Sequence, residues 1–171
     1  NTDDASLVLS TRGDQPTKLV YPSGPEGSRS WVNSSVYNHD GTLLASCIGD
    51  YPGPGDEIKI WNTKTGDEVA SIKSTSGQLF GDPSFSPSGN RLAFSDRSSN
   101  SIRFFDTSNW EELNEALPYT IKDNPDRPAN TAPRAASIIY SPDGSLVAST
   151  LLPYPGVIDG EINIWNTKNS E

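Results

Sequence analysis

The chain has 171 residues, of which 13 are lysine or arginine and 22 are aspartate or glutamate, so its formal net charge is −9. This acidic balance argues against binding to a nucleic-acid backbone, which needs a basic surface. No apolar run approaches the length of about 18 residues that a membrane-spanning helix requires. With one histidine and one cysteine, an intrachain disulfide is excluded and a His/Cys metal cluster is not expected. We therefore expect no nucleic acid, no membrane and no cofactor among its partners.

In chain order, the sequence predicts short strands separated by turns. A weak first unit contains DASLVLS (4–10) and KLVY (18–21). The second unit contains VYNHDGTLLAS (36–46), the alternating phrase EIKIWNTKTG (57–66) and the apolar stretch EVASI (68–72). Asp-Gly pairs are typical of hairpin turns, and alternation of apolar residues is typical of half-buried strands.

The later units repeat this order. A third unit runs from FSPSGNRLAF (85–94) into SIRFFDTSNW (101–110), and a fourth runs from IYSPDGSLVAS (139–149) into EINIWNTKNS (161–170). The only stretch with any helical character is 110–117, and it is short. We predict an all-β chain.

The units form an internal repeat. EIKIWNTKTG and EINIWNTKNS are identical at seven of ten positions and lie 104 residues apart. The turn glycines Gly41, Gly89 and Gly144 are spaced by 48 and 55 residues. Four antiparallel strands in a repeat with a core of about 40 residues are the pattern of a β-propeller blade.

These residues resemble a known family. The SPDG-type turn, the LLAS-type strand and the IWN-T-TG phrase are similar to those of WD-repeat β-propellers over nearly the whole chain, while the unit at 83–113 is similar to TolB-like propeller repeats. The resemblance implies a β-propeller of four-stranded antiparallel blades, with about four blades in this chain, the first and last of them incomplete. The expected blades span approximately 1–30, 31–76, 77–118 and 133–171, with a long inter-blade loop at 114–136.

One family feature is expected only in part. WD-repeat blades often carry a hydrogen-bonded tetrad that includes a histidine, whereas the one histidine here, His39, lies in a turn. The resemblance therefore implies partial tetrads, Ser46 with Trp61 and Ser149 with Trp165, with Phe94 and Phe105 replacing both residues in the middle unit.

The number of expected strands, about 14, is small for a closed propeller, and incomplete blades leave open sheet edges. We expect a piece of a larger propeller or a processed fragment in preference to a partial ring that a second copy closes. Missing blades or self-association would then complete the ring.

The sequence offers no catalytic motif, and we expect no enzyme activity from this chain. A Walker loop, a dinucleotide fingerprint and a Gly-x-Ser-x-Gly elbow are all missing from the sequence. His39 is expected to be a solvated turn residue and Cys47 a buried structural thiol. Asp50 and Asp56 lack the alternating carboxylates of a calcium loop, so no metal is expected.

Binding is the better-supported expectation. In propellers of this type the second-to-third strand loops and the inter-blade connections share one face, and here that face carries two loops that both contain Tyr-Pro-Gly, at 49–56 and 152–160. Tyrosine and arginine are favoured at interfaces. The residues expected to contact a protein or peptide partner are Tyr51, Asp50, Arg97, Tyr119, Arg127, Arg134 and Tyr154.

Several alternatives stay open. The loops can be neutral insertions, the chain can be a non-catalytic segment of a larger enzyme or of a TolB-like, periplasmic-type protein, or the propeller can bind a sugar or an ion. Trp31 is expected to precede a strand and to line or plug the central opening. Four aromatic residues are expected to pack between blades: Trp61, Trp165, Phe104 and Phe105.

Overall fold

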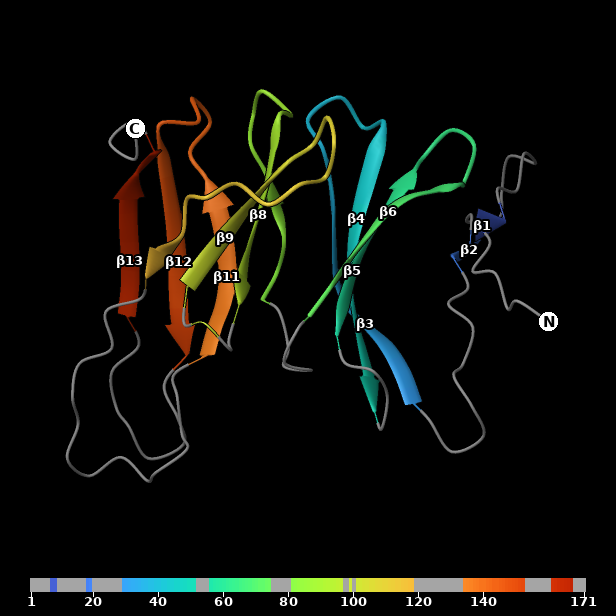
Figure 1. Ribbon diagram of the computed structural model, residues 1–171, viewed down its shortest axis with the longest axis horizontal. Helices are drawn as coiled ribbons and strands as arrows, with labels where there is room; N and C mark the ends of the chain where they lie inside the picture. The colour runs from blue at the N-terminus through green and yellow to red at the C-terminus, as the bar shows by residue number, and fades with distance from the viewer. Residues whose placement is uncertain are drawn as a thin grey trace.

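The computed structural model describes residues 7–8, 18–19, 29–51, 56–74, 81–96, 99, 101–118, 134–152 and 161–167, and all regular structure in these ranges apart from single turns is β. The strands form four antiparallel sheets, and within each sheet every strand pairs with its neighbour in the sequence. The sheets stand in a row that follows the order of the chain (Figure 1). The prediction of an all-β chain is confirmed.

The first sheet pairs β1 (Leu7–Val8) with β2 (Lys18–Leu19). The second sheet contains β3 (Arg29–Tyr37), β4 (Leu43–Tyr51), β5 (Glu57–Asn62) and β6 (Glu68–Lys73). The third contains β7 (Ser84–Phe85), β8 (Arg91–Asp96), β9 (Ser101–Asp106) and β10 (Leu117–Pro118). The fourth contains β11 (Arg134–Tyr140), β12 (Leu146–Leu152) and β13 (Glu161–Asn166).

Two local details differ from the sequence pattern. The stretch 110–117 is not helical, because Glu112 forms a bridge to Phe105 and Leu117 pairs with Ile102 at the sheet edge. Trp31 does not precede a strand. It lies inside β3, since β3 already starts at Arg29 and pairs with β4 through a bulge between Val32 and Ser34.

The hairpin turns before β4, β8 and β12 share one geometry. Gly41, Gly89 and Gly144 have φ angles of 73°, 75° and 71°, a left-handed conformation that costs glycine little. In each turn the glycine N–H donates to a carbonyl three residues earlier, at 2.8 to 3.1 Å. The Asp-Gly and Ser-Gly pairs of the sequence recur because these turns require glycine at the same position.

The repeated threonine of the IWNT and FFDT phrases joins two turns. Thr63, Thr107 and Thr167 each donate a hydroxyl hydrogen bond to the carbonyl of the turn glycine in their own sheet, at 2.6, 2.7 and 2.7 Å. This bond connects the turn before the second strand of each sheet with the end of the third strand. Threonine recurs at this position of each unit because its hydroxyl can donate this hydrogen bond.

Two apolar cores fill the spaces between neighbouring sheets. The first core includes Ala45, Ile58 and Ile60 of the second sheet together with Phe94 and Phe105 of the third. The two phenylalanine rings stack with centroids 5.2 Å apart. The alternation of β5 and β9 therefore places one face of each strand in a sheet-to-sheet interface, as expected for stacked blades.

The second core joins the third sheet to the fourth. It includes Ala93, Ile102 and Phe104 from the third sheet and Ile138 and Val147 from the fourth. The expected inter-blade packing is confirmed for Phe104, Phe105 and Trp165, the last of which packs, partly buried, against this second core. Trp61 is also buried.

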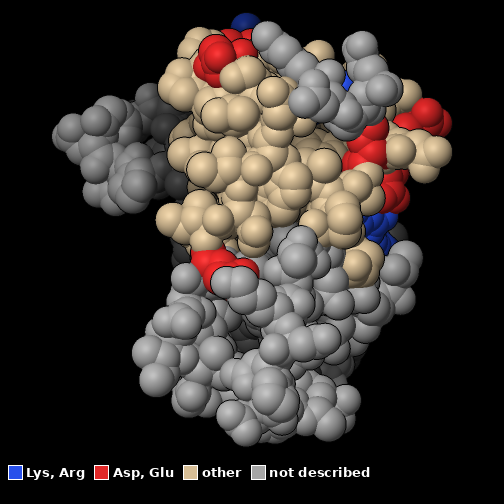
Figure 2. Space-filling view, turned by 90° about the vertical axis from the view of Figure 1, so that its left-hand side faces the viewer, with Lys and Arg blue, Asp and Glu red and all other residues tan. Residues whose placement is uncertain are grey.

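The outer face of the fourth sheet is apolar and exposed. Ile162 and Ile164 are 71% and 63% exposed, whereas Ile58 and Ile60, at the same positions of the repeated phrase, are 0% exposed. Ile139 and Leu146 are also exposed on this sheet. Figure 2 views this end of the molecule and shows an uncharged central area with aspartate and glutamate only at its rim. Another sheet packed against this side would form a third sheet-to-sheet interface. We call the surface formed by Ile139, Leu146, Ile162 and Ile164 the outer apolar face.

Candidate functional site

The loop-rich face predicted from the sequence starts where β4 and β12 end. Asp50 and Tyr51 are the last two residues of β4, and Tyr51 pairs with Arg29. Arg134 is the first residue of β11 and pairs with Leu152, the last residue of β12. These strand ends all point to the same edge of the molecule (Figure 1). The remaining predicted contact residues lie outside the described residues: Arg97, Tyr119, Arg127 and Tyr154.

β4 extends beyond the rest of its sheet. Its pairing with β5 stops at Ile48, so Gly49, Asp50 and Tyr51 pair with β3 alone. This two-stranded ribbon ends at Tyr51, the first residue of the Tyr-Pro-Gly sequence. In the third sheet, by contrast, β8 and β9 pair up to Asp96 and Ser101, which are the last residue of β8 and the first residue of β9.

Trp31 lies at the base of this ribbon. A Cβ atom added to Gly49 would come within 2.6 Å of the Trp31 ring, so glycine is needed there for the indole to lie against the backbone. The indole N–H donates to Asn33 Oδ1 at 2.8 Å, and the side chain is 41% exposed. An exposed aromatic side chain held on a strand is a typical contact residue. The sequence pattern did not select Trp31 for binding, although its position just before the loop-bearing hairpin was visible.

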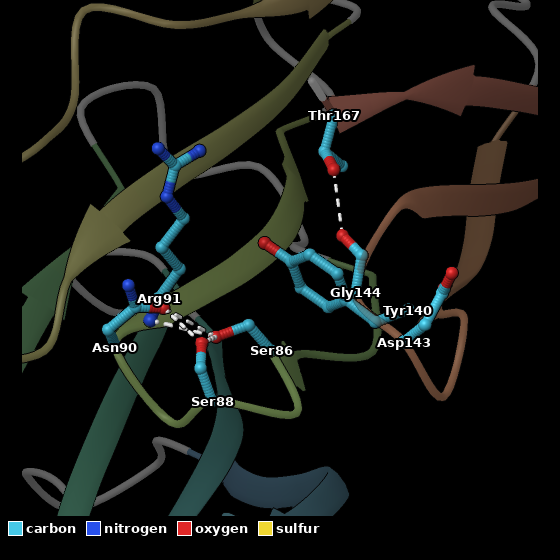
Figure 3. A pocket seen from close by; sticks show the side chains of 8 residues that line it. All are labelled: Ser86, Ser88, Asn90, Arg91, Tyr140, Asp143, Gly144 and Thr167. Carbon is cyan, nitrogen blue, oxygen red and sulfur yellow. Dashed lines mark hydrogen bonds between the residues drawn. The ribbon is translucent and has the colours of Figure 1, made fainter.

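A second candidate site lies on the opposite face, between the turns of the third and fourth sheets. A pocket of about 450 Å³ opens there (Figure 3). Its walls come from the β7–β8 turn, the β11–β12 turn and the residue after β13. The lining residues are Ser86, Ser88, Asn90, Arg91, Tyr140, Asp143, Gly144 and Thr167. We call it the turn pocket.

One wall of the turn pocket is held rigid by side-chain hydrogen bonds. Ser86 and Ser88 donate to Asn90 Oδ1 at 3.0 and 2.5 Å, and Arg91 donates to Glu115 at 2.7 Å. The Arg91 N–H also donates to Ser86 Oγ at 3.1 Å. The hydroxyl and amide groups on this wall therefore have fixed positions.

The other wall carries an aspartate and a buried tyrosine. Asp143 is exposed, and hydrogen bonds from Ser141 and Ser145 lower its pKa to about 2, so its carboxylate is ionised at neutral pH. Tyr140 is 8% exposed, and burial raises the pKa of its phenol, so it remains neutral. Its hydroxyl oxygen has no hydrogen-bond partner within the part of the chain that the structure describes.

The sequence did not indicate the turn pocket. Each of its walls is an ordinary tight turn when taken alone, and the two turns lie more than fifty residues apart. Packing of the third sheet against the fourth brings them together. The repeated serine and aspartate residues around the turn glycines were the available signal.

The expected partial tetrads are wrong. Ser46 Oγ lies 3.1 Å from Ser35 Oγ, and the Trp61 indole N–H has no acceptor among the described residues. Ser149 Oγ is likewise buried without a hydrogen-bond partner in those residues. A neighbouring strand thus supplied a serine partner to Ser46 that the comparison of β4 with β5 could not anticipate.

In the second and third sheets, a basic side chain instead lies near the aromatic ring at the end of the third strand. Arg103 lies 5.8 Å from the Phe94 ring centre and 5.5 Å from that of Phe105. Lys59, at the equivalent position of β5, lies 5.8 Å from the Trp61 ring centre. Arg103 also pairs with Asp96 at 3.2 Å and with Glu112, so this cation ties the sheet edge to the core.

The residues considered for chemistry have structural surroundings. His39 is exposed in its turn, as predicted, and Cys47 is fully buried, which raises the pKa of its thiol to about 12. Such a thiol is a poor nucleophile. Among the described ranges, no group of three or more His, Cys, Asp or Glu side chains could hold a metal ion. Those ranges also contain no helix long and apolar enough to cross a membrane.

Comparisons with known proteins show the fold. No protein-family model matches the chain, and no curated protein matches it. Among solved structures, hydrazine synthase of Kuenenia stuttgartiensis superposes with a TM-score of 0.60 at 20% sequence identity, covering 81% of this chain and 35% of that chain. A chain in the crystal structure of a mitotic checkpoint complex superposes with a TM-score of 0.53 at 18% identity, covering 83% and 36%.

Both matched structures have propeller-type folds, and the chain spans about a third of the length of each matched chain. Together with the four-stranded antiparallel sheets, these matches confirm that the chain folds as part of a β-propeller.

Proposed function

We propose that this chain is part of a WD-repeat-like propeller that serves as a scaffold for protein or peptide binding through its loop-rich face. The observation that carries the proposal is the common direction of the two Tyr-Pro-Gly-bearing strand ends, at Tyr51 and Leu152 (Figure 1). Loops on a rigid sheet framework are common positions for binding residues.

Trp31 adds a described aromatic contact to this face. Its ring lies against Gly49 on the ribbon that carries the first loop, so little conformational entropy is lost when a partner covers it. By sequence, Asp50, Tyr51 and Arg134 add one aromatic and two charged residue types at the strand ends of this face, and interfaces favour tyrosine and arginine.

We also propose that the chain itself is non-catalytic. Burial of Cys47 supports this, because it raises the pKa of the thiol to about 12, and a thiol that stays protonated is a poor nucleophile. His39 is exposed in its turn, as a solvated residue would be. The mitotic checkpoint complex is a protein assembly, which supports the idea that a propeller of this fold can act through protein contacts. Hydrazine synthase is an enzyme by name, so a non-catalytic segment of a larger enzyme is the second candidate.

The test compares three aromatic substitutions at the loop-rich face with one control substitution at the opposite end of β3. Trp31→Ala, Tyr51→Ala and Tyr154→Ala alter the loop-rich face, whereas Tyr37→Ala alters the turn end of the same strand, where Tyr37 is 61% exposed. Proteins captured from a lysate of the source organism are identified by mass spectrometry, and the purified candidates are then titrated against each variant. We expect the loop-face variants to weaken binding at least tenfold, or about 1.4 kcal/mol, and the Tyr37 variant to bind as the wild type does.

If all four variants bind every purified candidate equally, the loop-rich face is not the interaction surface. Equal loss in all four would indicate damage to the fold, which a circular dichroism spectrum of each variant would detect.

A further inference from the structure

The turn pocket has a property that neither of its turns has alone. It places a buried, neutral phenol, fixed serine and asparagine oxygens and an ionised carboxylate around one space of about 450 Å³. Pockets of roughly 300–1,000 Å³ are large enough to enclose a small ligand or one long side chain. We propose that the turn pocket is a second binding site that takes a lysine or arginine side chain of a partner peptide.

The charges around the pocket favour a cation. Among the described lining residues Arg91 is the one cationic side chain, and its guanidinium is already paired with Glu115 at 2.7 and 3.5 Å. Asp106 pairs opposite Arg91 in the sheet, and Asp143 stands at the rim. Glu115 and Asp106 thus lie beside this guanidinium, and Asp143 adds another carboxylate to the pocket lining. The chain as a whole carries a net charge of −9. An anionic ligand would have to approach against this balance.

The hydrogen-bonding groups also suit a cation. A lysine ammonium has three donors and an arginine guanidinium five, and neither accepts a hydrogen bond, so the site must supply acceptors. Asp143 offers carboxylate oxygens, and Ser86 and Ser88 offer hydroxyl oxygens on the opposite wall. The Tyr140 hydroxyl is a further acceptor whose oxygen has no partner in the described residues. Figure 3 shows the Tyr140 ring reaching from the β11 side toward the wall that Arg91 and Ser86 form.

A buried hydroxyl without a partner destabilises a fold by about 1–3 kcal/mol, so its presence beside a pocket calls for an explanation. A ligand donor, or a water molecule in the same place, would remove that cost. The two explanations differ in what a cationic peptide does to the pocket, and this difference can be measured.

The experiment uses the full chain labelled with nitrogen-15 and three blocked tripeptides: acetyl-Gly-Lys-Gly-amide, acetyl-Gly-Arg-Gly-amide and, as the uncharged control, acetyl-Gly-Gln-Gly-amide. Backbone amide shifts are followed during each titration. Gly144 reports on the pocket, and Gly41, in the equivalent turn of the second sheet, is the internal control because the two turns share one geometry. We expect saturable shifts at Gly144 with the lysine and arginine peptides, weaker in added salt, and none at Gly41.

Two matched variants assign the binding to the pocket. Asp143→Asn removes the rim charge, and Asp40→Asn removes the corresponding charge in the control turn, where Asp40 accepts hydrogen bonds from Thr42 as Asp143 does from Ser145. We expect Asp143→Asn to weaken binding about fivefold, the effect of losing one partly exposed ion pair, and Asp40→Asn to leave it unchanged. Tyr140→Phe, which keeps the ring, should weaken binding without loss of stability.

Three results would overturn the proposal. The first is a shift of Gly144 by the glutamine peptide as large as that by the lysine peptide, which would indicate a site for uncharged ligands or peptide backbone. Asp40→Asn could weaken binding as much as Asp143→Asn, which would indicate attraction by the overall charge. The third is no saturable shift at Gly144 with either cationic peptide, which would leave water as the partner of Tyr140.

This inference does not rest on the loop-rich face. Trp31→Ala should leave the tripeptide titration unchanged, so failure of one proposal is distinguishable from failure of the other.

Discussion

The repeated phrase offers the same substitution in two surroundings. Ile60 and Ile164 occupy the same position of EIKIWN and EINIWN, yet Ile60 is 0% exposed in the core between two sheets and Ile164 is 63% exposed on the outer apolar face. We predict that Ile60→Ala and Ile164→Ala differ strongly in their effect on the free energy of unfolding. Local sequence is a poor explanation for that difference, because the two six-residue phrases differ only at Lys59 and Asn163.

The expected magnitudes follow from the burial of each side chain. Removing a fully buried isoleucine side chain down to alanine costs about 2–5 kcal/mol, through lost transfer energy and the cavity that remains. Ile164 has only about a third of its surface covered, so scaling a full burial energy of about 1.5–3 kcal/mol gives a loss of about 0.5–1 kcal/mol. Since domains have total stabilities of about 5–15 kcal/mol, Ile60→Ala removes a large share of the total.

Urea titration followed by tryptophan fluorescence measures both variants, because the chain contains four tryptophan residues. Far-ultraviolet circular dichroism at the same urea concentrations checks that unfolding is two-state. Equal losses of several kcal/mol would refute the reasoning, since they would mean that the outer apolar face is covered in solution. Sedimentation velocity on the wild type would then show whether a second copy covers it.

Three further predictions concern side chains whose contacts recur between sheets. Thr107→Val should lower the free energy of unfolding by about 0.5–1.5 kcal/mol, because the Gly89 carbonyl loses its hydroxyl donor, and Thr107→Ser should restore it in the same urea titration. Arg103→Met should lower it by about 1.5–3 kcal/mol through loss of the hydrogen bonds to Asp96 and Glu112, with Arg103→Lys intermediate because Lys59 holds the equivalent position. The pKa of Asp143 is lowered in the folded chain from 3.8 to about 2, so its contribution to the free energy of unfolding is complete above about pH 4 and is lost as the pH falls to about 2. Thermal melts across this range should show a smaller loss of stability with acid for Asp143→Asn than for the wild type. An equal loss would contradict the assignment.

The strands and turns were predictable from the sequence because each depends on local chemistry. Alternating isoleucine residues in 57–61 and 161–165 predicted β5 and β13, and the glycines at 41, 89 and 144 predicted turns that need a positive φ. These features involve neighbours within a few residues. Comparison of the units was therefore enough to find them.

Burial could not be predicted in the same way. Whether the isoleucine residues of a repeat unit are covered depends on the next sheet. Ile58 and Ile60 of β5 lie in the core with the third sheet, whereas Ile162 and Ile164 of β13 lie on the outer apolar face. The expected pair of Ser46 with Trp61 is missing for a similar reason. Ser46 lies against Ser35 on β3, and the repeated phrase begins only at Val36. The predicted contact residues Asp50, Tyr51 and Arg134 were expected in loops, whereas they lie at the ends of β4 and β11. Their part in binding stays a prediction, and the exposed Trp31 was not among the predicted contact residues.

The two candidate sites lie at opposite ends of the strands, and this separation has a measurable consequence. β4 has nine residues, and at about 3.3 Å for each residue its ends are about 27 Å apart. That distance is about three times the Debye length of about 8 Å at physiological ionic strength, so charges at one end are screened from the other. Coupling through the sheet would need a second arrangement of the strands, yet the threonine bonds and the two apolar cores hold a single one. The effects of Trp31→Ala and Asp143→Asn on their respective ligands should therefore be additive in the double variant, within about 0.5 kcal/mol. A larger coupling energy would mean that binding at the turns changes the loop-rich face, and the sheets would then have to move relative to one another.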